Sequence, residues 1–208
     1  MILFAIGAAI YYFVNQETVP LTGRKQLRTM DTDQEMALGL QSYKQILSDS
    51  RVLSPNEPAV QAIQEIGDRL ARTADEMLIE ETGEPSGFDW AVNVIDSDQA
   101  NAFALPGGYS AVYTGLIPIA QNEDGLAVIM GHEIAHALAH HGAERMAQQN
   151  MQRIVGAGVS LGAGGMDYGA QRAVMGVFGG ISQYGYACLL YTSPSPRDRT
   201  RSRMPSSA

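Results

Sequence analysis

The stretch His132-Glu133-Ile134-Ala135-His136 holds two of the chain's four histidines, and its H-E-x-x-H spacing specifies a local structure. On an α-helix, residues at positions i and i+4 lie on one face, one turn apart. Two imidazoles placed in this way can bind one zinc ion, each nitrogen at roughly 2.0–2.1 Å from it. Glu133 follows the first histidine and can activate a water molecule at the same metal. The pattern is typical of a metalloprotease site, with His132 and His136 as ligands and Glu133 as general base.

The sequence around this motif predicts a long helix. Asn122 can cap its start, and Glu123 and Asp124 place negative charge in the first turn, where the helix dipole favours it. We expect the helix to be apolar on most sides and buried, and buried polar groups need partners. A metal would supply a partner for the polar residues of the motif. The apolar residues in question are Leu126, Val128, Ile129, Met130, Ile134, Ala135, Ala137 and Leu138.

A zinc site of this kind needs a third protein ligand. A metzincin would have glycine at position 139 and histidine at position 142, but the chain has Ala139 and Gly142. The alternative third ligand is a glutamate, and the last glutamate is Glu144, which we place on the motif helix two turns beyond His136. We expect Glu144 to form a structural or surface pair with Arg145. On the same helix His140 would flank the site. His141 would point away from the two ligands, so we expect it to support the site from outside the ligand set or to lie on the surface, and not to bind the metal.

Composition limits the class of protein. A chain of 208 residues suits one or two domains, and a hydrophobic content of 45% permits a real core. The net charge of −8 argues against a nucleic-acid partner, which would need a basic face. The single cysteine, Cys188, permits no intramolecular disulfide and no cysteine-ligated structural zinc.

The first fourteen residues carry no charge and are mostly apolar. A transmembrane helix needs about 18–20 such residues, and a signal peptide has a positive start that is missing here. The segment is therefore either a short membrane anchor or signal remnant, or a buried helix. We favour the first and assign residues 1–17 to it, because an uncharged run at the N-terminus is typical of export.

Turn-forming residues and hydrophobic periodicity predict the secondary structure between residue 15 and the motif helix. Residues 15–28 have the breakers of an extended linker, helices are predicted from Asp31 to about Leu47 and over 60–70, and residues 75–84 form an acidic, solvated surface. The expected apolar face of the first helix is Met36, Leu40 and Ile46. Residues 88–94 alternate as a strand does, and Pro106-Gly107-Gly108 predicts a tight hairpin or a bulge. This hairpin either packs in the core or offers an edge to an extended substrate.

The C-terminal part of the sequence changes character. Residues 156–185 are rich in glycine, which lowers helix propensity, so no firm helix is predicted there. Residues 188–208 are rich in serine, proline and arginine and cannot build a core, so we expect a disordered tail. This tail resembles a translated sequencing adapter or vector. We therefore expect a domain over 18–187, with the native sequence continuing differently after about Ala187.

Several blocks together resemble a known family. The chain is similar to the gluzincin peptidases of the CAAX prenyl protease superfamily, and within it to bacterial envelope proteases and the mitochondrial inner-membrane quality-control protease of the Oma type. The resemblance covers roughly residues 18–187. The blocks that carry it are Pro20–Leu27, Asn101–Gly108, Val112–Leu116, and Gly131–Ala137 continuing through His141–Arg145.

The resemblance implies an α+β fold, mostly helical, of the zincin type, with a long active-site helix beside a small sheet. It implies zinc-dependent endopeptidase activity on misfolded or membrane-associated envelope proteins, in the periplasm or anchored to a membrane, with the mitochondrial inner membrane as the less favoured alternative. By position, His132 and His136 match the zinc ligands and Glu133 the general base. The third ligand would be a glutamate beyond residue 187. In the family, one strand edge lies beside the substrate-binding cleft. The residues that correspond to it by position are Asn101, Gly107, Gly108, Tyr109 and Ala111.

Two other functions remain open at this point. Because the chain as given lacks a third zinc ligand, it could be an inactive fragment or a module that binds unfolded chains. It could also be a structural domain whose histidines bind another metal.

Overall fold

The computed structural model describes residues 2–163, and the chain divides into two units. The main unit comprises residues 11–148 and contains the predicted site. The described residues of the second unit are 2–10 and 149–163, which are helical. They belong to α1 (Ile2–Val14) and α6 (His141–Ala163).

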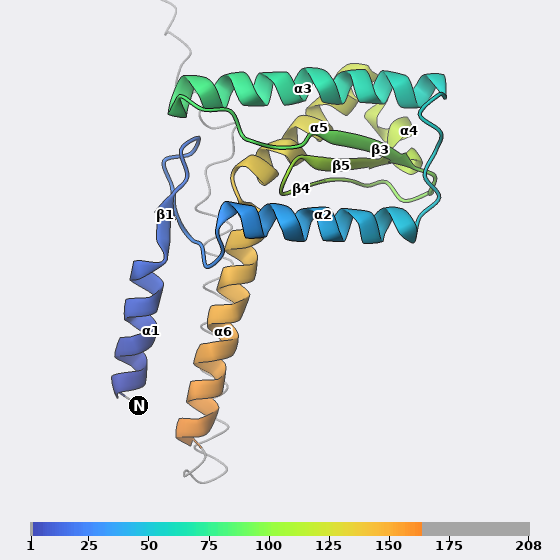
Figure 1. The fold of residues 1–208 in the computed structure, drawn as a ribbon. Helices are drawn as coiled ribbons and strands as arrows, with labels where there is room; N and C mark the ends of the chain where they lie inside the picture. Colours follow the sequence, from blue (N-terminus) through green and yellow to red (C-terminus); the bar gives the residue numbers. More distant parts are fainter. Residues whose placement is uncertain (1, 164–208) are drawn as a thin grey trace, which may run out of the picture. The chain divides into compact units, whose positions relative to one another are not determined.

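A three-stranded sheet forms the centre of the main unit (Figure 1). Its order is β3 (Ala91–Ile95), β5 (Tyr109–Tyr113), β4 (Ala102–Leu105). Strand β5 runs parallel to β3, with Val94 opposite Val112, and antiparallel to β4, with Phe103 opposite Ala111. The predicted alternating strand is thus present, beginning at Ala91, and the predicted hairpin joins β4 to β5. Gly107 and Gly108 adopt φ values of 91° and 86°, which glycine adopts without steric cost.

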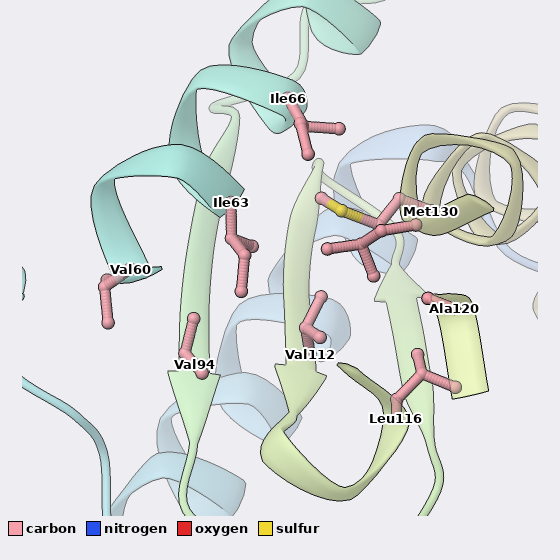
Figure 2. Packing of buried hydrophobic residues seen from close by; sticks show 9 residues of the cluster. Val60, Ile63, Ile66, Val94, Val112, Leu116, Ala120 and Met130 are labelled. Carbon is pink, nitrogen blue, oxygen red and sulfur yellow. The ribbon is translucent and has the colours of Figure 1, made fainter. Parts of the chain in front are cut away.

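Helices cover both faces of this sheet. On one face α3 (Pro58–Thr82) and α5 (Glu123–Leu138) pack against alternate strand residues such as Val94 and Val112 (Figure 2). On the other face α2 (Thr32–Ser48) packs against the intervening residues Ile95 and Ala111. Because successive strand residues point to opposite faces of the sheet, alternate residues of each strand contribute to two separate core clusters, one under α3 and α5 and one under α2. A short 3-10 turn (Thr114–Leu116) and α4 (Ile117–Ala120) connect β5 to α5. The α+β class expected from the sequence is confirmed.

Helix α2 begins as predicted, and Leu40 and Ile46 of its expected apolar face pack against the core, although its most buried residues are others. The Asp31 side chain accepts a hydrogen bond from the Gln34 backbone N–H at 2.8 Å, which caps the helix. The buried residues are Glu35, Gly39 and Tyr43, whereas the expected Met36, Leu40 and Ile46 are only half-buried. Gly39 lets the helix backbone approach Pro106 of the β4–β5 hairpin closely. Burial raises the pKa of Tyr43, whose hydroxyl donates to the Ser110 carbonyl.

Replacement of Gly39 by alanine is expected to destabilise the main unit by about 1–3 kcal/mol. The added Cβ would overlap the Pro106 carbonyl oxygen, a backbone atom that cannot move without shifting the hairpin. Urea unfolding followed by circular dichroism measures the loss. Gly142→Ala is the control, because a Cβ there meets nothing within 4 Å. Equal midpoints for the two variants would contradict the close approach of α2 and the hairpin.

Helix α3 extends further than the sequence predicted. It continues past Leu70 to Thr82 and ends at Gly83, which has a φ of 85°. Most of the acidic stretch is exposed as expected, but Asp75 is not part of that surface. Its carboxylate accepts hydrogen bonds from the Ser86 backbone N–H at 3.0 Å and from Trp90 Nε1 at 3.1 Å. Asp75 therefore ties the end of α3 to the loop that leads into β3.

The segment predicted as a linker is structured, and that prediction was wrong. Residues 15–28 contain an antiparallel pair, β1 (Gln16–Thr18) and β2 (Lys25–Leu27), with buried Val19, Gln26 and Leu27. Pro20 and Gly23, which suggested a linker, lie in the turn between the two strands. Each strand has only three residues, too few to show an alternation of apolar and polar side chains. Among the described helices, none combines the length and hydropathy that crossing a membrane requires. The membrane anchor over residues 1–17 stays a prediction.

The C-terminal predictions fall mostly outside the described residues. The glycine-rich segment is helical from Gly156 to Ala163, as the end of α6. The remainder of that segment and the tail at 188–208 lie outside the described residues. The domain over 18–187 likewise stays a prediction.

Candidate active site

Helix α5 carries the H-E-x-x-H motif and begins where the sequence predicted. The Asn122 Oδ1 accepts a hydrogen bond from the Gly125 backbone N–H at 2.8 Å. Only one face of the helix is buried, contrary to the expectation of burial on most sides. His132 and His136 are exposed and Glu133 is half-buried, so the motif is accessible from solvent. The residues that hold the opposite face in the core are Leu126, Met130, Ile134 and Ala137.

The two motif histidines converge on one point. Their Nε2 atoms lie 3.0 Å apart, with ring planes at 83° to each other. Two imidazole nitrogens bound to one tetrahedral zinc ion at roughly 2.0–2.1 Å would be separated by about 3.3 Å. The donor atoms therefore fit a shared metal ion. Among residues 2–163, no group of three potential ligand side chains is present. The glutamate ligand expected beyond residue 187 lies outside the described residues.

His141 lies next to the motif, which corrects the sequence prediction. Helix α5 ends at Leu138, and the chain turns at His140, which has a φ of 53°. His141 then begins α6, and its Nδ1 lies 2.5 Å from Nδ1 of His136. On one continuous helix, position i+5 would face elsewhere. The helix break is what brings His141 back to the site.

Burial favours the neutral form of the His136 and His141 rings. Partial burial lowers the pKa of His136, aided by His132 and Arg145 and opposed by Glu133. Burial also lowers the pKa of His141 to about 4, aided by His136 and the Arg24 and Arg145 guanidinium groups. A neutral imidazole has a free nitrogen lone pair, which is the form that binds metal ions. The site is therefore ready for a metal near neutral pH.

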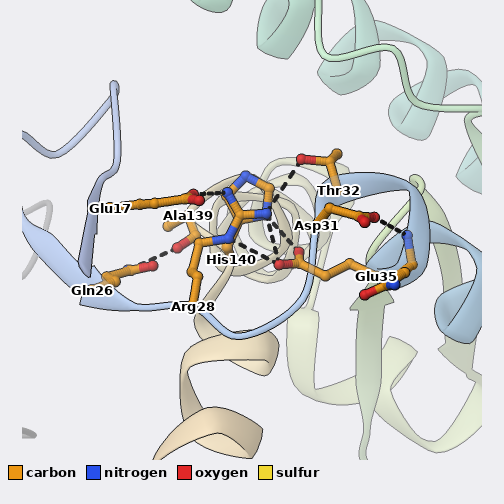
Figure 3. Close-up of polar contacts among 9 residues, drawn as sticks. Glu17, Gln26, Arg28, Asp31, Thr32, Glu35, Ala139 and His140 are labelled. Atoms are coloured by element: carbon orange, nitrogen blue, oxygen red, sulfur yellow. Dashed lines mark hydrogen bonds and ion pairs between the residues drawn. The ribbon is translucent and has the colours of Figure 1, made fainter. Parts of the chain in front are cut away.

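The N-terminal part of the main unit fixes the turn between α5 and α6 (Figure 3). The Gln26 side-chain amide donates to the Ala139 carbonyl at 2.8 Å. Glu35, whose side chain is 1% exposed, pairs with Arg28 at 2.8 Å and with His140 Nδ1 at 2.7 Å. We call Arg28, Glu35 and His140 the Glu35 cluster. It bridges positions 105 residues apart in the sequence.

These supporting contacts were not expected from the sequence. The Glu144 carboxylate binds the Arg24 guanidinium through both oxygens and does not form the expected pair with Arg145. The segment containing Arg24, Gln26 and Arg28, predicted as a linker, supplies the other contacts. One signal was available, because Pro20–Leu27 is among the blocks that carry the family resemblance. A block shared with a family is seldom only a connection.

The predicted substrate edge does not match the sheet. Strand β5 is the central strand, so its backbone is paired on both sides. Tyr109 and Ala111 are buried, and Gly107 and Gly108 form the buried hairpin turn. An extended peptide cannot pair with residues 107–112. Among the described strands of this sheet, β4 has one unpaired edge beside α5, and the exposed Asn101 precedes it.

A helix that carries H-E-x-x-H beside a small mixed sheet defines a zincin-type metallopeptidase domain. Comparison with known families agrees, since residues 61–197 match peptidase family M48. The chain belongs to this family, whose members are metallopeptidases.

Individual relatives are similar over much of this chain. It is 31% identical over 167 residues to the mitochondrial metalloendopeptidase OMA1 of Schizosaccharomyces pombe, covering 79% of this chain and 46% of the relative. It is 27% identical over 157 residues to the human mitochondrial metalloendopeptidase OMA1, covering 74% and 29%. The beta-barrel assembly-enhancing protease of Yersinia pestis is 31% identical over 134 residues, covering 64% and 26%. The chain spans about half the length of the yeast relative.

Proposed function

We propose that this chain is the catalytic part of a zinc-dependent metalloendopeptidase. The observation that carries the proposal is the convergence of the His132 and His136 Nε2 atoms, 3.0 Å apart, on the exposed face of α5. Membership of peptidase family M48 and relatives named as metalloendopeptidases support it. Zinc held by these two nitrogens and a third ligand would polarise a peptide carbonyl and acidify a water molecule.

Glu133 is the proposed general base and acid. It lies between the two ligands in sequence and close enough to His136 to oppose the lowering of the pKa of that ring by burial. Its carboxylate would accept a proton from the attacking water. The same proton would then pass to the amine nitrogen that leaves when the peptide bond breaks. The exposure of the motif gives a polypeptide access to these groups.

We infer that the substrate is an extended polypeptide. It would pair with the free edge of β4, and not with β5 as the sequence predicted. The free edge of β4 lies beside α5, so a peptide added there would run past the motif. Asn101, at the start of this edge, is the one predicted substrate residue that remains suitably exposed. Hydrogen bonds between backbones depend little on the identity of the substrate's side chains. Such pairing therefore suits a protease that acts on unfolded segments of many proteins.

The proposed setting is a membrane or envelope compartment, with misfolded or membrane-associated proteins as substrates. Relatives include proteins named as mitochondrial and as a beta-barrel assembly-enhancing protease. We propose the bacterial envelope as the location and residues 1–17 as the link to a membrane. The apolar character of α1 supports this, since it carries no charged residue. The mitochondrial inner membrane is the alternative.

A binding module for unfolded chains is the second candidate. It rests on the two-ligand arrangement, because residues 2–163 contain no group of three side chains that could hold a metal ion together. In that case the β4 edge would hold an extended polypeptide without cleaving it. A structural domain that binds another metal is the third possibility, and metal analysis separates it from the other two.

Removal of the metal is expected to abolish proteolysis, and zinc to restore it. The chain would be analysed for metal content, stripped with a chelator, and assayed for cleavage of casein before and after the addition of zinc. We expect one zinc per chain and cleavage that follows zinc content. Chelator-resistant cleavage would overturn the proposal. Casein bound without cleavage at full zinc content would support the binding module, and a strong preference for another metal the structural domain.

A further inference from the structure

We propose that His141 is a positioning residue that accepts a hydrogen bond from Nδ1–H of His136 and so presents Nε2 of that ring to the metal. The inference rests on the proposed zinc site and extends it. Its basis is the Nδ1–Nδ1 distance of 2.5 Å between the two rings. Within residues 2–163, His141 is the side chain that lies within hydrogen-bond distance of this nitrogen, and it comes from a different helix.

The direction of the hydrogen bond follows from the two nitrogens of His136. A neutral imidazole carries its proton on one nitrogen and a lone pair on the other. Nε2 of His136 faces Nε2 of His132, so this is the nitrogen that needs the lone pair to bind a metal. The proton of His136 is then on Nδ1 and points at Nδ1 of His141, which must accept it. His141 in turn carries its own proton on Nε2.

The contact matters because the opposite arrangement would block the site. If His141 donated from Nδ1, His136 would carry its proton on Nε2, directed at His132. The metal would then have to displace that proton and reverse the hydrogen bond. A fixed acceptor opposite the far nitrogen of a ligand histidine sets its tautomer and its ring orientation. His141 occupies that place for His136.

The position of His141 is determined by contacts remote from the motif. His141 follows the turn at His140, whose φ of 53° is unusual for a residue other than glycine. The Glu35 cluster holds the His140 side chain, and Gln26 holds the Ala139 carbonyl. On the other side of His141, Glu144 pairs with Arg24. These three contacts keep the start of α6 beside His136.

Two substitutions of similar shape test whether His141 acts as a hydrogen-bond acceptor or only fills space. Asparagine places Oδ1 the same number of bonds from the backbone as Nδ1 of histidine, so His141→Asn keeps an acceptor. His141→Leu fills a similar space without one. We expect zinc affinity, measured by competition with a chromophoric chelator, to fall by roughly 10–100-fold in His141→Leu. His141→Asn should bind zinc at least about tenfold more tightly than His141→Leu. Equal affinity in the two variants would overturn the proposal.

The tautomer of His136 provides a readout that needs no zinc. Imidazole nitrogen NMR shifts of the metal-free chain are expected to show the proton of His136 on Nδ1, and both tautomers in His141→Leu. A proton on Nε2 in the unaltered chain would contradict the inference. Gly142→Ala, in the same helical turn with open space around its Cβ, controls for damage to the start of α6. It should leave zinc affinity and tautomer unchanged.

The two measurements also keep the two proposals apart. If the unaltered chain binds no zinc, the proposed function fails, and the NMR measurement still decides the role of His141. If zinc binds and supports cleavage while His141→Leu matches the unaltered chain in affinity and tautomer, the function stands and the role of His141 is wrong.

Discussion

Replacement of Glu133 by glutamine is expected to lower kcat for peptide hydrolysis by about 10²–10⁴-fold, the contribution of a positioned general acid–base group. Glutamine has nearly the same shape but cannot take up a proton from water near neutral pH. Zinc affinity should change little, because Glu133 is not one of the converging nitrogen donors. Cleavage of a fluorogenic casein gives kcat and KM, and metal analysis on the same samples gives the zinc content.

The matched control is Glu123→Gln on the same helix. Glu123 is exposed in the first turn of α5, where its charge favours the helix by a few tenths of a kcal/mol, at most about 1 kcal/mol. The Glu123→Gln variant should therefore retain the full kcat of the unaltered chain. Loss of activity in Glu133→Gln together with loss of zinc would assign Glu133 a structural role instead. Full activity in Glu133→Gln would remove it from the mechanism.

The sequence predicted those parts of the fold that depend on local periodicity and capping. The alternation over 88–94 gave a strand of the central sheet, and Asp31 and Asn122 both cap helices as expected. Gly107 and Gly108 form the predicted hairpin turn. In each case the residues that carry the signal lie within a few positions of the structure they specify, so no long-range information is needed.

Strand order and helix breaks depend on contacts that are distant in sequence. The parallel pairing of β3 with β5 makes β5 central, and nothing in the segment around Tyr109 records this. The break after Leu138 is equally hidden, because the residue with positive φ is His140 and not a glycine. A stabilising partner for His140 comes from Glu35, 105 positions earlier. The motif residues His132, Glu133 and His136 were identifiable from spacing alone, whereas the contact of His141 with His136 was not.

Replacement of Glu35 is expected to cause the largest loss of stability in the main unit. Alanine would remove the carboxylate that pairs with both Arg28 and His140, so His140 would lose this partner and Arg28 would keep only partners outside the buried pair, such as the exposed Glu17. Breaking one side of a buried ion pair costs about 3–5 kcal/mol. Glu35→Gln keeps part of the hydrogen bonding and should cost about 1–3 kcal/mol. Urea unfolding followed by the fluorescence of Trp90, the chain's one tryptophan, measures both losses.

Glu17 offers a control that shares a partner with Glu35. Its carboxylate also pairs with Arg28, at 2.7 Å, but its side chain is 57% exposed. Glu17→Gln should therefore cost at most about 1 kcal/mol. Equal losses for Glu17→Gln and Glu35→Gln would mean that pairing with Arg28, and not burial against His140, accounts for the role of Glu35. A larger loss for Glu35→Gln, with weaker zinc binding in the folded variant, would link the Glu35 cluster to the metal site through the turn that carries His141.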